Sequence, residues 1–134
     1  MAKWLRWLSV APSAVLAWFI AVYVVLELRR LALALCPAEM VFSGTECDAA
    51  WFATVDHALM PFGAGLAAVL VVLLPTVIAP SHRRMVAWAV FVVGAGIAAV
   101  PGIGGFYLEF SAAIVSGLLT ALVADKRVAS KHDA

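Results

Sequence analysis

The chain has 134 residues, of which 66% are hydrophobic and 13% are charged, and its formal net charge is +1. Ordinary soluble domains carry about 25% charged residues, so this chain has too few charges to cover a globular surface. The near-neutral balance gives no general electrostatic reason to expect a nucleic-acid partner. The mean hydropathy of +1.06 indicates an integral membrane protein instead.

Four long apolar runs fill most of the sequence. A helix needs about 20 mainly apolar residues to cross the hydrocarbon core of a bilayer. The sequence therefore predicts an all-α fold, a four-helix transmembrane bundle that forms a single membrane domain. The first run exceeds the roughly 7–15 residues of a secretory signal and ends at Glu27 without a small-residue cleavage site, so we expect a retained helix. The runs cover about residues 7–28, 59–79, 85–100 and 106–124.

The distribution of basic residues predicts the topology. A long connection, about residues 29–58, separates the first two runs. If both termini are cytoplasmic, only Arg29 and Arg30 of the nine basic residues fall outside. Cytoplasmic loops are enriched in Lys and Arg, so we expect this N-in, C-in orientation, and the alanine- and valine-rich texture favours a bacterial inner membrane. The basic residues then inside are Lys3, Arg6, Arg83, Arg84, Lys126, Arg127 and Lys131.

Both cysteines, Cys36 and Cys47, lie in this extracytoplasmic loop. Two thiols that face an oxidising compartment are expected to pair, and Ser43-Gly44 supplies a turn between them. A disulfide that closes about 12 residues contributes on the order of 3 kcal/mol in the chain-entropy model. We favour this structural role over a redox role, because catalytic thiol pairs are usually closer in sequence. Two thiols also lack the remaining ligands of a tetrahedral metal site.

Only a few residues indicate where the first two helices end and begin near the extracytoplasmic loop. Trp51 and Phe52 are predicted to anchor the outer interface. Residues 31–35 either extend the first helix or lie in that interface, and Pro37 disfavours a helical continuation beyond Cys36. Pro61 is expected in the first turns of the second helix, where its missing N–H is tolerated.

Five glycines in the runs offer small surfaces on which helices can approach closely. Several of them form small-xxx-small pairs, a spacing typical of packed membrane helices. We favour packing within the bundle, and the alternative is an interface with a second copy or with another membrane protein. The glycines are Gly63, Gly65, Gly94, Gly96 and Gly117.

Ionisable groups near the outer ends of the runs are the candidate functional residues. Glu109 lies inside the fourth run, about one turn from its outer boundary. A central charge in a membrane helix costs at least about 2.5 kcal/mol on insertion scales, so it is a functional candidate by default. We favour the interpretation that these ionisable groups are ordinary boundary charges. The alternative is that Glu109 pairs with Arg29, Arg30 or His57 in a polar pocket that binds a substrate or a proton. The candidates at this depth are Glu27, Arg29, Arg30, Asp56, His57 and Glu109.

Metal and cofactor chemistry has weak support. Asp56, His57 and Glu109 are of the right types to bind a divalent metal, but they lack a tight metal-binding spacing. The sequence contains no phosphate-binding glycine motif and no nucleophile–base motif. We therefore predict no metal, no cofactor and no catalytic residue.

Three hypotheses for function remain. The first is a non-enzymatic accessory subunit of a larger transport, lipid-handling or envelope complex. The second is a small transporter or flippase, working as a homo-oligomer, with Glu109 at its outer site. The third is a membrane-embedded enzyme that acts on a lipid headgroup, with Asp56, His57 and Glu109 as acid–base groups. In each case the surrounding partner is the lipid bilayer.

Overall fold

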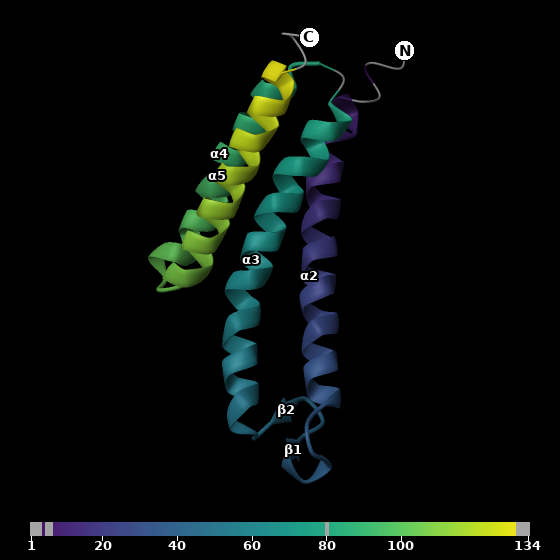
Figure 1. Ribbon diagram of the computed structural model, residues 1–134, viewed down its shortest axis with the longest axis vertical. Helices are drawn as coiled ribbons and strands as arrows, with labels where there is room; N and C mark the ends of the chain where they lie inside the picture. Colours follow the sequence, from purple (N-terminus) through teal and green to yellow (C-terminus); the bar gives the residue numbers. More distant parts are fainter. Residues whose placement is uncertain (1–3, 5–6, 80, 131–134) are drawn as a thin grey trace.

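The computed structural model describes residues 4, 7–79 and 81–130. Each of the four long helices in this part of the chain is apolar enough to cross a membrane, which confirms the predicted all-helical membrane fold. The helices are α2 (Val10–Ala34), α3 (Ala50–Ile78), α4 (Arg83–Ile103) and α5 (Tyr107–Ser130) (Figure 1). Between α2 and α3 lie a short 3-10 helix (Ala38–Met40) and the strands β1 (Val41–Phe42) and β2 (Glu46–Cys47).

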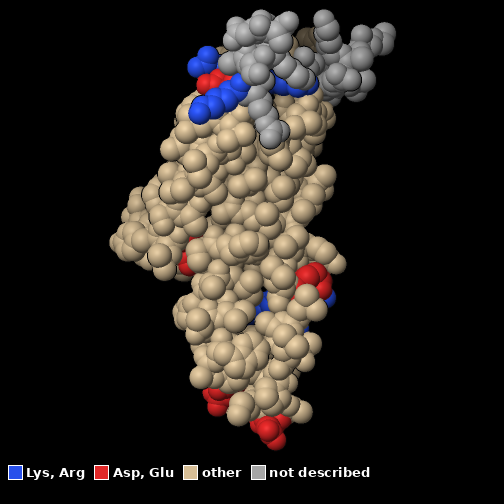
Figure 2. All heavy atoms as spheres, viewed as in Figure 1, with Lys and Arg blue, Asp and Glu red and all other residues tan. Residues whose placement is uncertain are grey.

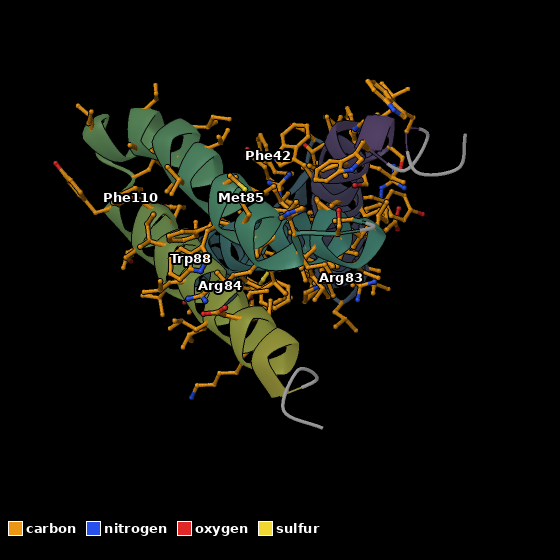
Figure 3. The ribbon with its side chains drawn as sticks, turned by 90° about the horizontal axis from the view of Figure 1, so that it is seen from above. Phe42, Arg83, Arg84, Met85, Trp88 and Phe110 are labelled. Carbon is orange, nitrogen blue, oxygen red and sulfur yellow. A yellow bond between two sulfur atoms is a disulfide. The ribbon has the colours of Figure 1, made fainter. Side chains whose placement is uncertain are left out.

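The four helices form two hairpins, α2–α3 and α4–α5, that pack side by side. Helix α3 lies between α2 and the α4–α5 pair and packs against all three other helices, whereas α2 packs chiefly on α3 (Figures 1 and 3). A buried cluster of Val72, Ala87 and Ala121 joins α3, α4 and α5. Only 11–17% of each apolar stretch is buried, so most of the helix surface requires lipid or another protein as its neighbour.

The two ends of the molecule differ in charge. One end holds the first turn of α2, the start of α4 and the last turns of α5 (Figure 1), with the ion pair between Arg84 Nε and Asp125 Oδ1 at 2.7 Å; we call it the terminal end. The opposite end holds β1 and β2, and we call it the disulfide end. On the face shown in Figure 2, charged side chains gather at the terminal end and reappear toward the disulfide end, with an uncharged band between them. This band matches the apolar span of a bilayer.

The first two helices are longer than predicted on the side of their connection. Helix α2 continues to Ala34 and α3 begins at Ala50, so the predicted loop of residues 29–58 shrinks to 35–49. Phe52 explains why both helices extend into this region. Its side chain is only 5% exposed and packs with Cys47, Ala49 and the last turn of α2, so the apolar contacts continue beyond the first charges. The prediction of an interfacial anchor is therefore wrong for Phe52.

The interior of α3 also differs from the prediction. Pro61 lies well inside α3 and not in its first turns, because the helix begins earlier, and the helix continues through both Pro61 and Pro75. Each proline removes one intrahelical hydrogen bond. Helix α4 runs to Ile103, slightly past the predicted end at about residue 100. In the short turn between α4 and α5, Gly105 adopts a left-handed φ of 105°.

The predicted disulfide is confirmed. Cys36 and Cys47 are bonded, with their Cα atoms 6.2 Å apart. The strands between them pair antiparallel, with Val41 opposite Cys47. Three residues, Ser43, Gly44 and Thr45, separate the paired residues Phe42 and Glu46. Ser43 and Gly44 both have left-handed φ values, 56° and 70°. The predicted turn at these two residues is therefore present.

The glycines divide into two groups. Gly63 meets Val25 of α2, Gly65 meets Ser116 of α5, and Gly117 meets Phe91 of α4, so these three allow helices of the same chain to approach. The Ser116 hydroxyl adds a polar link, 3.1 Å from the Gly65 carbonyl oxygen. Among the described residues, nothing lies within 4 Å of a Cβ built on Gly94 or Gly96. These two glycines therefore do not provide a close approach between described helices.

We predict that Gly63→Ala destabilises the fold and that Gly94→Ala does not. A Cβ at Gly63 would lie 2.7 Å from Cγ2 of Val25, whose rotamer is restricted in a helix. Overpacking of this kind costs about 1–3 kcal/mol. At Gly94 the added methyl meets open space, and alanine favours the helix by up to about 1 kcal/mol. Reversible unfolding in mixed micelles, followed by circular dichroism, measures both; equal stabilities would contradict the prediction.

Candidate functional site

An ion pair joins α2 and α3 toward the disulfide end. Arg29 Nε donates to Asp56 Oδ1 at 2.7 Å, and the two side chains are 37% and 34% exposed. Both residues were expected in the loop, but both lie in helices because α2 and α3 extend beyond the predicted bounds. The pair therefore links the two helices across their interface as well as marking the boundary of the apolar band.

A second ion pair lies within α2. Arg30 Nη1 donates to Glu27 Oε1 at 3.1 Å, and the Arg30 side chain is 76% exposed. Residues three apart on a helix are neighbours, and such pairs typically contribute about 0.2–0.5 kcal/mol. This pair has the character of ordinary boundary charges, the interpretation that the sequence favours for Glu27 and Arg30.

Among the described residues, Glu109 does not pair with Arg29, Arg30 or His57. It lies in the first turn of α5, next to the turn between α4 and α5, and its side chain is half-buried. Arg29 and Arg30 bind Asp56 and Glu27. Helix α3 separates α2 from the α4–α5 pair, which explains why Glu109 does not meet the two arginines of α2 (Figure 3). The first-turn position itself favours a carboxylate, because the helix dipole is positive there.

The depth of Glu109 is nevertheless informative. A helix rises about 1.5 Å per residue, which places Glu109 about 24 Å along α5 from Asp125, the residue paired with Arg84. The hydrocarbon core is about 30 Å thick. If Asp125 marks one boundary, Glu109 lies inside the apolar span. Within the described residues its carboxylate has neither an ion pair nor a hydrogen bond.

Asp56, His57 and Glu109, the residues of the metal and enzyme alternatives, lie on two different helices. Asp56 is bound to Arg29, His57 is exposed beside it on α3, and Glu109 lies on α5. Across the part of the chain that the structure describes, no three His, Cys, Asp or Glu side chains are grouped so that they could hold a metal ion. The three proposed acid–base residues therefore do not form one constellation.

The disulfide end carries a feature that the sequence analysis missed. We call residues 35–49 the tip. Leu35 and Phe42 in the tip are 78% and 74% exposed. The α2–α3 hairpin reaches beyond the turn of the α4–α5 hairpin, so the tip projects from the rest of the molecule (Figure 1). Residues 31–55 contain three acidic residues and no basic residue. The signal available in the sequence was this combination of apolar and acidic residues between the two cysteines and directly beside them.

Comparisons with known proteins do not assign the site. No protein-family model, curated protein or solved structure matches the chain. The functional argument therefore depends on the geometry described above.

We predict that the two ion pairs differ in strength. A double-mutant cycle with Arg29→Gln and Asp56→Asn should give a coupling of about 0.5–1 kcal/mol, the usual range for partly exposed pairs and for polar contacts between membrane helices. The matched cycle with Arg30→Gln and Glu27→Gln should give less, because Arg30 is mostly exposed. Unfolding free energies in mixed micelles provide both values. A larger coupling for Arg30 and Glu27 would show that the helix-crossing pair is not the stronger link.

Proposed function

We propose that the protein is a non-enzymatic accessory subunit of a larger transport, lipid-handling or envelope complex in a bacterial inner membrane. In this proposal the terminal end is cytoplasmic and the tip is outside. The basic residues Arg83, Arg84 and Lys126, at the start of α4 and toward the end of α5, support the orientation, because Lys and Arg are enriched on the cytoplasmic side. The disulfide supports it independently, because disulfides persist in oxidising compartments.

The observation that carries the proposal is the shape and chemistry of the tip. Phe42 and Leu35 expose large apolar side chains on a projection that lies beyond the α4–α5 hairpin. The disulfide and the β1–β2 pairing restrict the tip, so binding through it would lose little conformational entropy. A rigid aromatic side chain on a projecting loop is a common anchor in protein interfaces. The acidic residues beside it, Glu39, Glu46 and Asp48, fit a partner whose binding surface is basic around an apolar centre.

The membrane-embedded part is consistent with a subunit that needs neighbours. Helix α2 packs chiefly on α3, and α4 leaves Gly94 and Gly96 uncovered by its own chain. Without a hydrophobic driving force in lipid, small residues of this kind allow close contact with a further helix. The chain thus combines little extramembrane mass with open helix faces.

A second candidate function is favoured by Glu109 alone. A half-buried carboxylate within the apolar span, without an ion pair among the described residues, resembles the proton or substrate sites of transporters. This candidate requires an oligomer, because Glu109 is not joined by the other predicted polar residues in one chain. A transport activity that depends on the Glu109 carboxylate would distinguish this candidate from the accessory subunit.

We predict that Phe42→Ser releases the partner protein. Purification of the tagged chain from its own membrane in mild detergent, followed by native mass spectrometry, should give a stoichiometric complex. Loss of an exposed aromatic anchor should weaken this complex at least about tenfold, equivalent to about 1.4 kcal/mol. Glu109→Gln should leave the complex intact.

Val77→Ser is the matched control, because Val77 is 63% exposed but lies near the terminal end of α3, far from the tip. Equal retention of the partner by Phe42→Ser and the unmodified protein would overturn the tip as the binding site. A pure homo-oligomer whose transport activity is abolished by Glu109→Gln would replace the accessory-subunit proposal with the transporter.

A further inference from the structure

An apolar groove runs along the surface between α2 and α3. Its volume is about 330 Å³, and it is lined by residues within 18–26 of α2 and 59–67 of α3. This volume falls at the lower end of the range of ligand sites, about 300–1,000 Å³. Every lining residue is apolar, and the groove lies in the uncharged stretch of both helices.

The groove is hollow because small residues form its floor between larger ones. Ala21 on α2 and Gly63, Ala64 and Ala67 on α3 leave space where longer side chains would fill it. Gly63 also brings the two helices together at Val25, which fixes the floor. Larger side chains flank the hollow, including Trp18, Leu26 and Met60, each of which is more than half exposed.

Charged residues close the groove toward the disulfide end. On a helix, residues three and four apart lie on one face. Arg29 therefore lies on the same face of α2 as the groove residue Val25, one turn further along the helix. Arg30 has the same relation to the groove residue Leu26. On α3, Asp56 stands one turn before Met60 on the same face. The Arg29–Asp56 ion pair thus stands at the boundary end of the groove.

The direction of α2 brings its arginines closer to the groove. Helical side chains lean toward the N-terminus of their helix, so a residue covers the surface over the preceding turn. In α2 the preceding turn of Arg29 and Arg30 contains Val25 and Leu26, which line the groove. Each guanidinium has five N–H donors, and among the described residues each donates one hydrogen bond to a carboxylate, Arg29 to Asp56 and Arg30 to Glu27. The exposed Arg30 in particular retains donors for another acceptor.

We propose that this groove binds a membrane phospholipid, with one acyl chain along its apolar floor and the phosphate against Arg29 and Arg30. The bilayer supplies acyl chains at high local concentration to any apolar hollow that faces it. The arginines stand at the depth where headgroups lie, and guanidinium groups bind phosphate oxygens in a bidentate manner. The apolar floor and the cationic end thus match the two parts of one lipid. This inference is independent of the accessory-subunit proposal.

The test is native mass spectrometry of the full chain, delipidated and then titrated with phosphatidylglycerol in detergent. The unmodified protein should bind one lipid molecule in preference to further copies. Ala64→Leu fills the floor and should weaken this binding at least tenfold. Ala89→Leu is the matched control, because Ala89 is exposed on α4 away from the groove, and it should bind as the unmodified protein does. Ala67→Leu provides a second filling variant if Ala64→Leu does not fold.

A second measurement tests the headgroup. Arg30→Gln should weaken phosphatidylglycerol binding several-fold and leave the binding of diacylglycerol with the same chains unchanged. Because Arg30 is mostly exposed, this variant should fold normally.

Three outcomes would overturn the proposal. Equal lipid binding by Ala64→Leu and Ala89→Leu would show that bound lipid is only bulk solvation of the helices. Loss of a partner protein from Ala64→Leu, with lipid binding unchanged, would show that a helix of another chain covers the groove. Equal weakening of both lipids by Arg30→Gln would show that the arginine does not recognise phosphate.

Discussion

The rest of this structure depends on one constraint: a lipid bilayer provides no hydrophobic driving force that brings transmembrane helices together. Lipid tails are as apolar as leucine, so the hydrophobic effect that compacts a soluble domain is absent between these spans. Close approach at small residues must replace it. Gly63 against Val25 joins α2 to α3, and Gly65 against Ser116 joins α3 to α5. Both of these contacts involve α3, and α3 also packs against α4, so the other three helices assemble around α3.

This arrangement explains why the predicted polar pocket does not form. Residues placed at similar depth by their position in the sequence meet only if their helices are adjacent. Arg29 and Asp56 meet because α2 and α3 are neighbours, and Glu109 does not reach the arginines of α2 because α3 stands between the two helices. The hydropathy of the sequence predicts how deep a residue lies in the membrane. It does not predict which helices are adjacent, because that depends on which helix faces pack together, and the small-xxx-small spacing does not specify the pairs.

The sequence predicted the features that depend on composition. Four spans follow from apolar length, and the Cys36–Cys47 bond follows from two thiols in one loop with a turn between them. The bounds of that loop were not predictable in the same way. Hydropathy ends a helix at its first charges, here Glu27, Arg29 and Asp56, yet the helices continue because Phe52 and the disulfide form a small core beyond the apolar band. That core combines residues from both helices and the tip, so no single segment signals it.

The glycines also show that a sequence pattern does not specify which helix faces pack together. Gly63 and Gly94 both stand in small-xxx-small spacing, and the spacing alone cannot distinguish them. Gly63 faces Val25, whereas among the described residues nothing lies within 4 Å of a Cβ built on Gly94. Gly63 lies on the face of α3 that packs on α2, and Gly94 lies on a face of α4 that no described helix approaches so closely. A spacing motif thus predicts a surface suited to close contact, and the tertiary arrangement decides whether the chain itself or its surroundings occupies that surface.

The two hairpins divide the candidate functions between them. The tip, the Arg29–Asp56 pair and the apolar groove all belong to α2–α3, whereas Glu109 and the uncovered glycines belong to α4–α5. Within α2–α3, the tip lies beyond the membrane boundary and the groove lies within it, with the ion pair between them. A protein partner at the tip and a lipid in the groove would therefore occupy one hairpin without competing for the same residues. Because Glu109 is on the other hairpin, its substitution separates a transport role from either kind of binding.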